Sequence, residues 1–110
     1  MAALTMTVPA AAGTTVTSNS PSASDTVSST QLGTQGCNLR IQTAGTGSNV
    51  TVSDAGLTPA SNPATVTAVV MAATAVKVVY ISPAQVNLST GVVTITSTSQ
   101  TSMTYELYPA

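Results

Sequence analysis

Few side chains in this sequence could take part in catalysis. The chain has no histidine, and its charged residues are only Asp25, Arg40, Asp54, Lys77 and Glu106. Cys37 is the only cysteine, and a cysteine nucleophile needs a neighbouring base to activate it. Three carboxylates that lie far apart in the sequence do not form a recognisable acid–base pair. We therefore expect that the protein is not an enzyme and that Cys37 is a small buried side chain.

The same residues give little basis for a metal, cofactor or nucleic-acid site. Asp25 and Asp54 carry the oxygen ligands that calcium prefers, but neither lies in a cluster of Asp, Asn and Glu residues. Both are better explained as solvated residues that cap turns. Gly45 and Gly47 precede no helix and have no lysine nearby, unlike the glycines of a phosphate-binding loop. Two basic residues are too few for phosphate contacts, so we expect no metal, no cofactor and no nucleic-acid partner.

The composition is unusually neutral for a protein of this size. About a third of the 110 residues are serine or threonine, only 5% are charged, and the formal net charge is −1. Soluble domains average about 25% charged residues. A surface of this kind gives little electrostatic repulsion between copies. Two interpretations remain open, namely a robust β domain that tolerates neutrality and a subunit that is packed into an assembly.

The positions of the apolar residues predict strands. They recur at every second residue and not at every third or fourth. The most apolar stretch, 75–81, is expected to be a strand that is buried on both faces, with Val76, Val78 and Tyr80 on one side. Because no amphipathic helix is available to cover it, other strands must do so. The sequence therefore predicts an all-β fold, an antiparallel β-sandwich of about eight strands with little or no helix.

The same alternation locates the other strands. They are expected at 14–17, 26–30, 37–43, 50–53, 64–70, 92–97 and 103–108. We expect 37–43 and 50–53 to form one hairpin, 92–97 and 103–108 to form another, and 71–74 to join 64–70 to 75–81. The residues expected to face inward are Cys37, Leu39, Ile41, Val93, Ile95, Met103, Tyr105 and Leu107.

Residues 1–13 are expected to form an N-terminal arm or edge strand that precedes the sandwich domain, 14–110. Leu4, Met6 and Val8 would form one apolar stripe. The stripe fits an edge strand of the chain's own sheet, and it also fits an arm that adds as a strand to a neighbouring subunit. The N-terminus lacks the pattern of a secretory signal, and 64–81 fits two strands better than a membrane helix. We expect no membrane partner.

The order of features from Asp25 onward can be compared with known families. Asp25-Thr26-Val27 precedes a turn at Gly33, and strands at 39–41 and 49–52 follow. An apolar strand then ends at 81–83, Gly91 opens 92–95, and the last strand ends at 107–108. In this order the chain resembles the small head decoration proteins on the capsids of tailed bacteriophages.

This resemblance implies a non-enzymatic β-sandwich that is made in the host cytoplasm and binds the outer capsid surface of the virion. Its partner would be the lattice of the major capsid protein, which the decoration protein helps to hold against internal pressure. Copies would form a homo-oligomer, and a trimer is expected first because of the symmetry of capsid surfaces. The alternative is an adhesion or carbohydrate-binding module, in which Tyr108 would be the exposed aromatic residue.

Overall fold

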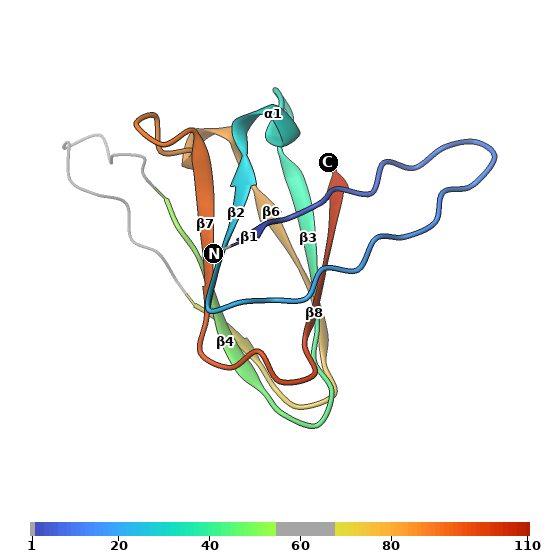
Figure 1. Cartoon of the computed structure of the whole chain (residues 1–110), viewed down its shortest axis with the longest axis vertical. Helices are drawn as coiled ribbons and strands as arrows, with labels where there is room; N and C mark the ends of the chain where they lie inside the picture. The colour runs from blue at the N-terminus through green and yellow to red at the C-terminus, as the bar shows by residue number, and fades with distance from the viewer. Residues whose placement is uncertain (1, 55–67) are drawn as a thin grey trace.

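The structure, a computed structural model, describes residues 2–54 and 68–110. In this part of the chain, eight strands form two sheets that pack face to face, which confirms the predicted β-sandwich (Figure 1). In chain order, the elements are β1 (Ala2–Ala3), β2 (Ser24–Ser28), α1 (Ser29–Leu32), β3 (Cys37–Gln42), β4 (Ser48–Val52), β5 (Val69–Met71), β6 (Val76–Ile81), the 3-10 helix η1 (Pro83–Gln85), β7 (Val92–Ser97) and β8 (Thr104–Pro109).

The two sheets differ in size. One has five strands in the order β1-β2-β7-β4-β5, and the other has three in the order β6-β3-β8. Neighbouring strands are antiparallel, except that β1 runs parallel to β2. All eight residues that the alternation places inside are buried in the core between the sheets: Cys37, Leu39, Ile41, Val93, Ile95, Met103, Tyr105 and Leu107. The predicted inner face is therefore confirmed.

The two predicted hairpins are wrong. β3 belongs to the three-stranded sheet and β4 to the five-stranded sheet, and β8 and β7 are divided in the same way. The connections over 43–47 and 98–103 therefore cross from one layer to the other. Alternation fixes which side chains face the core, but it does not say which layer a strand joins. β5 and β6 also lie in different sheets, and residues 64–67 of the predicted strand 64–70 lie outside the described residues.

The strand predicted to be buried on both faces is an edge strand. β6 ends the three-stranded sheet and pairs only with β3 among the described strands. Its inner side chains include Ile81, which is buried, but its outer side chains Val76, Val78 and Tyr80 are exposed. The prediction fails because an apolar face can be covered by a partner molecule as well as by the chain's own strands.

Asp25 also differs from the prediction. It does cap a turn, because its carboxylate accepts hydrogen bonds from the backbone N–H and the hydroxyl of Ser22, at 2.9 and 2.7 Å. It is not solvated, however, but completely buried in β2.

Neither helix in residues 2–54 and 68–110 has the length and hydrophobicity that a bilayer crossing requires.

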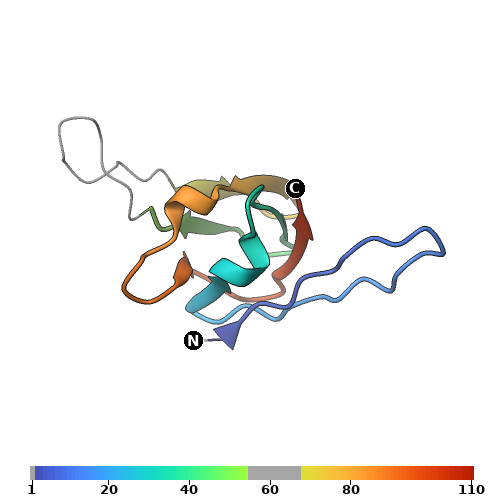
Figure 2. The ribbon, with the colours of Figure 1, turned by 90° about the horizontal axis from the view of Figure 1, so that it is seen from above.

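The N-terminal segment closes one side of the sandwich and then leaves it. The N–H of Leu4 donates to Thr26 of β2, and the N–H of Thr7 donates to Leu107 of β8, so residues 2–7 connect the two sheets. Residues 8–18, here called the arm, then project beyond β8 in both views (Figures 1 and 2). Within the predicted arm or edge strand, 1–13, β1 lies at the edge of the five-stranded sheet, and the projecting part begins at residue 8 and extends beyond residue 13. The strand predicted at 14–17 has no strand pairing among the described residues.

Candidate functional site

The one cysteine is in a position that suppresses its reactivity. Cys37 is buried at the start of β3, where its Sγ lies 3.3 Å from the carbonyl oxygen of Gln31. Burial raises the pKa of this thiol, so it remains protonated at neutral pH. Within the described ranges, no three Cys, Asp or Glu side chains come together as a metal site. Two surface features of the molecule are more informative, a sheet face and the arm.

The first feature is the outer face of the three-stranded sheet. The strand register aligns its side chains in three rows that run across β6, β3 and β8. Val76, Gln42 and Thr104 form the first row, Val78, Arg40 and Glu106 the second, and Tyr80, Asn38 and Tyr108 the third. The face therefore has an apolar side along β6 and a polar side along β3 and β8.

The apolar side, here called the β6 column, consists of Val76, Val78 and Tyr80. These side chains are 50%, 63% and 54% exposed. The hydroxyl of Tyr80 donates a 2.8 Å hydrogen bond to the carbonyl oxygen of Gln35, which fixes the position of the ring. Three large apolar side chains in one line on a strand are the kind of surface that proteins cover with a partner. Because β-branched and aromatic side chains have few rotamers, little side-chain entropy is lost when a partner covers them.

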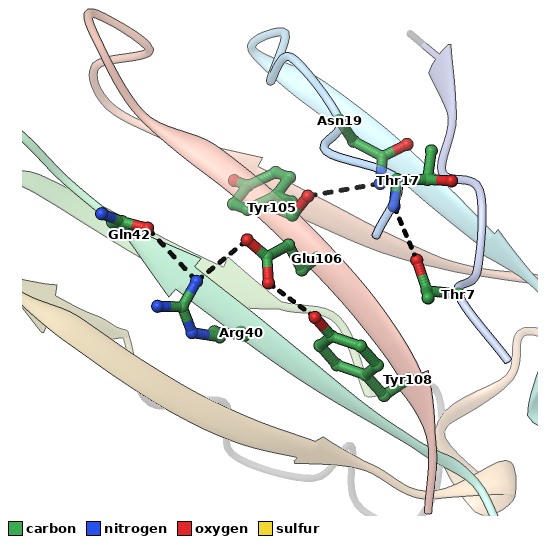
Figure 3. A network of polar contacts seen from close by, with 8 residues as sticks. All are labelled: Thr7, Thr17, Asn19, Arg40, Gln42, Tyr105, Glu106 and Tyr108. Carbon is green, nitrogen blue, oxygen red and sulfur yellow. Dashed lines mark hydrogen bonds and ion pairs between the residues drawn. The ribbon is translucent and has the colours of Figure 1, made fainter. Parts of the chain in front are cut away.

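On the polar side, the two charged side chains bond to each other and to neighbouring polar side chains (Figure 3). Arg40 forms an ion pair with Glu106, with 2.9 Å between Nη1 and Oε2, and also donates to Gln42 at 3.2 Å. The Tyr108 hydroxyl donates to the other oxygen of Glu106 at 2.7 Å, and this hydrogen bond to a carboxylate raises the pKa of Tyr108. The network adds little to stability, since partly exposed ion pairs contribute at most about 1 kcal/mol. Its consequence is that the outer face has two opposite charges and no net charge.

The second feature is the arm, which is fastened at both ends. Asn19 exchanges backbone hydrogen bonds with Tyr105, and its side chain donates to the carbonyl of Thr5 and accepts from the N–H of Thr5. The N–H of Thr17 donates to the Thr7 hydroxyl at 2.9 Å (Figure 3). Both ends of the arm are thus held along β8. Beyond them, Val8 and Val16 are exposed.

No protein-family model, curated protein or solved structure matches this chain. Its function must therefore be inferred from its own residues and fold.

The predicted interface residues Leu4, Met6 and Val8 differ in how deeply the structure buries them. Leu4 is buried in the chain's own core, and Met6 packs partly against that core. Val8 is exposed at the base of the arm. In this arrangement only Val8 is free to contact a neighbouring molecule.

Sequence reasoning missed the β6 column. It assigned the three residues to the core and named Tyr108 as the exposed aromatic, whereas Tyr80 is the more exposed of the two. One signal could have located the column. Lys77 interrupts an otherwise apolar strand, and a lysine at such a position is typical of edge strands, where it discourages uncontrolled pairing.

Proposed function

We propose that this protein is a structural subunit that binds the outer surface of a bacteriophage head and stabilises the shell. The observation that carries this proposal is the outer face of the three-stranded sheet, which combines a rigid apolar column with a neutralised polar side. Such a face fits a large, ordered surface such as the lattice of a major capsid protein. The order of strands and turns that resembles capsid decoration proteins supports the same choice.

The mechanism would be additive attachment. Each copy buries a modest area, in which Val76, Val78 and Tyr80 are removed from water and contribute roughly 1 to 2 kcal/mol each. One such contact is weak once the cost of association is subtracted. When copies are joined in a symmetric oligomer, for which a trimer is the first expectation, several contacts form together and attachment becomes avid. The attached oligomer would hold neighbouring shell subunits at fixed spacing.

The proposal predicts saturable binding to undecorated capsids through the β6 column. Val76→Asp should weaken co-sedimentation with such capsids at least tenfold, because Val76 is opposed by the uncharged Gln42 and docking would bury a carboxylate without an ionic partner. Leu88→Asp is the matched control, since Leu88 is 95% exposed on the turn before β7, a strand of the other sheet. Sedimentation at increasing protein concentration gives both the affinity and the stoichiometry. Failure of the unmodified protein to co-sediment, or equal binding by the two variants, would refute the proposal.

Attachment through this face should depend little on salt. Only Arg40 and Glu106 are charged on it, and they already neutralise each other. We expect the Kd for capsids to change by less than about threefold between 0.05 and 0.5 M NaCl, because apolar and hydrogen-bonded contacts are not screened by ions. The same sedimentation assay measures this. Release of the protein by salt would show that ion pairs to the shell provide the attachment.

The alternative function is adhesion through carbohydrate binding, and one observation favours it. Tyr80 and Tyr108 lie in the same row of the outer face, on either side of Asn38. Aromatic rings beside an amide can stack on a sugar ring and bond its hydroxyls. A glycan array separates the two functions. Binding that is lost in Tyr80→Ala would establish the alternative, and an array without binders would remove it.

A further inference from the structure

Residues 14–17 have the composition of a strand but pair with no strand in residues 2–54 and 68–110. The segment reads Thr-Thr-Val-Thr, and threonine and valine are among the residues most enriched in strands. In the described part of the chain, it makes no ladder with any strand. Among the described residues, the hydrogen bond that holds this segment runs from the N–H of Thr17 to the side-chain hydroxyl of Thr7 and does not belong to a strand pair. The segment is therefore suited to a strand but has no strand partner among the described residues.

A strand elsewhere in the molecule lacks a neighbour in the same way. β6 pairs with β3 along one edge, and no described strand pairs with its other edge. Open edges of apolar strands are the usual acceptors for an added strand. The charge at this edge is Lys77, whose Nζ donates to the carbonyl oxygen of Val70 at 2.8 Å. Residues 8–18 carry no charge, so nothing in the arm would repel the edge or require a counter-charge.

The arm cannot reach the open edge of its own chain without detaching. Its ends are held along β8, which is the opposite edge of the same three-stranded sheet. The arm also projects away from that sheet (Figures 1 and 2). Five residues of extended chain span about 17 Å, whereas adjacent strands are about 5 Å apart. The arm is therefore long enough to cross to a neighbouring molecule placed beside β8.

We propose that residues 14–17 of one copy add as a strand to the open edge of β6 in a second copy. Val16 would then lie beside the β6 column and extend it by one apolar side chain. Because the arm leaves from β8 and arrives at β6, the contact is head-to-tail, and a head-to-tail contact that closes produces a ring. The strand edge and the outer face are different surfaces, so the ring leaves the face free. This inference concerns contact between copies and does not depend on capsid attachment.

Cysteine cross-linking tests the contact directly. Val16→Cys is mixed in turn with Val76→Cys, Val78→Cys and Tyr80→Cys under mild oxidation, because the register of the added strand decides which pair is opposed. Opposed residues on adjacent strands lie within the distance that a disulfide can span. We expect one mixture to give a covalent heterodimer in high yield, and Val16→Cys with Leu88→Cys to give none. Buried Cys37 should not compete. Absence of the heterodimer from all three mixtures would overturn the proposal.

A pair of proline variants in the same arm tests the pairing in solution. Thr15→Pro removes a backbone N–H within 14–17, whereas Ala11→Pro lies in the turn closed by the hydrogen bond from Gly13 to Ala10, where proline is tolerated. Light scattering at about 100 μM protein should show an oligomer for the unmodified chain and for Ala11→Pro, and at least tenfold weaker association for Thr15→Pro. Equal urea midpoints would show that both variants keep the sandwich. A monomeric unmodified chain, or equal association by both variants, would overturn the proposal.

These results separate the contact between copies from the proposed function. A cross-linked ring that does not co-sediment with capsids would support the arm-to-β6 contact and refute decoration. Monomers that co-sediment would refute the contact and leave decoration supported.

Discussion

Gly36→Ala is expected to lower the free energy of unfolding by about 3 kcal/mol. Gly36 lies directly before β3 with φ = +83°, a conformation that alanine adopts only with strain. It is also buried, and a Cβ there would collide with the carbonyl oxygen of Ile81 in β6. That oxygen belongs to the backbone of a paired strand, so it cannot move without disturbing the sheet. Both costs apply at once, which makes this one of the most damaging small substitutions in the chain.

Gly91→Ala is the matched control. Gly91 also has positive φ, at +72°, but a Cβ there would meet no atom within 4 Å. It should cost only the conformational strain, about 1 kcal/mol. Urea denaturation of both variants at neutral pH measures the difference, which isolates the steric collision at Gly36. If the two variants lost the same stability, the close approach of Gly36 to β6 would be wrong.

Gly36 also connects stability to the candidate site. The Cβ of an alanine would lie 2.9 Å from the hydroxyl oxygen and 3.0 Å from Cε1 of Tyr80. Tyr80 is the aromatic member of the β6 column, and its hydroxyl bonds Gln35 next to Gly36. The absence of a side chain at position 36 thus allows the ring to lie against the backbone. Variants that displace the ring should weaken docking even where the sandwich still folds.

The fold class could be predicted from the sequence because the apolar period is local. Leu39 and Ile41 in β3, and Tyr105 and Leu107 in β8, follow a period of two that only a strand can bury on one side. The assignment of strands to sheets could not be predicted in the same way. β3 and β4 are joined by a connection that suits a hairpin equally well, and their separation depends on long-range packing between layers. Local patterns do not contain that information.

The candidate site was harder to predict for a related reason. Val76, Val78 and Tyr80 have the composition of a core strand, and a single chain does not reveal whether its core or a partner covers them. Leu4 shows the opposite case, because it belongs to a stripe that suits an interface and yet is buried in the chain's own core. Strands that contact partners and strands that fill cores use the same side chains. Only the arrangement in space distinguishes them.

Two substitutions of Tyr105 are expected to change stability in opposite directions. Tyr105 is the largest fully buried side chain among the described residues, and it projects from β8 into the core. Tyr105→Ala should lower the free energy of unfolding by about 4 kcal/mol, because it removes the ring and leaves a cavity. Tyr105→Phe keeps the ring and removes a buried hydroxyl that, in the described part of the chain, makes no hydrogen bond of acceptable geometry, although the Ser97 side chain lies nearby. It should raise the free energy of unfolding by about 1 kcal/mol, since a buried polar group without a partner is destabilising.

The pH dependence of Tyr105→Phe provides a second, independent readout. Burial raises the pKa of Tyr105 above its usual value; the nearby Ser97 side chain lowers it by a smaller amount, and the carboxylate of Asp25 raises it slightly further. Below about pH 10 both the folded and the unfolded chain keep this phenol protonated, so its contribution to stability is constant. As the pH rises further, the unfolded chain releases the proton first, and stability falls until the folded pKa is reached. Urea denaturation at pH 8 and at pH 10.5 should therefore show a smaller alkaline loss of unfolding free energy in Tyr105→Phe than in the unmodified chain.

Tyr108 also has a raised pKa and stays in both proteins, so part of the loss should remain. An unchanged alkaline loss, or a phenylalanine variant less stable at pH 8, would show that the Tyr105 hydroxyl is solvated or bonded in the folded protein.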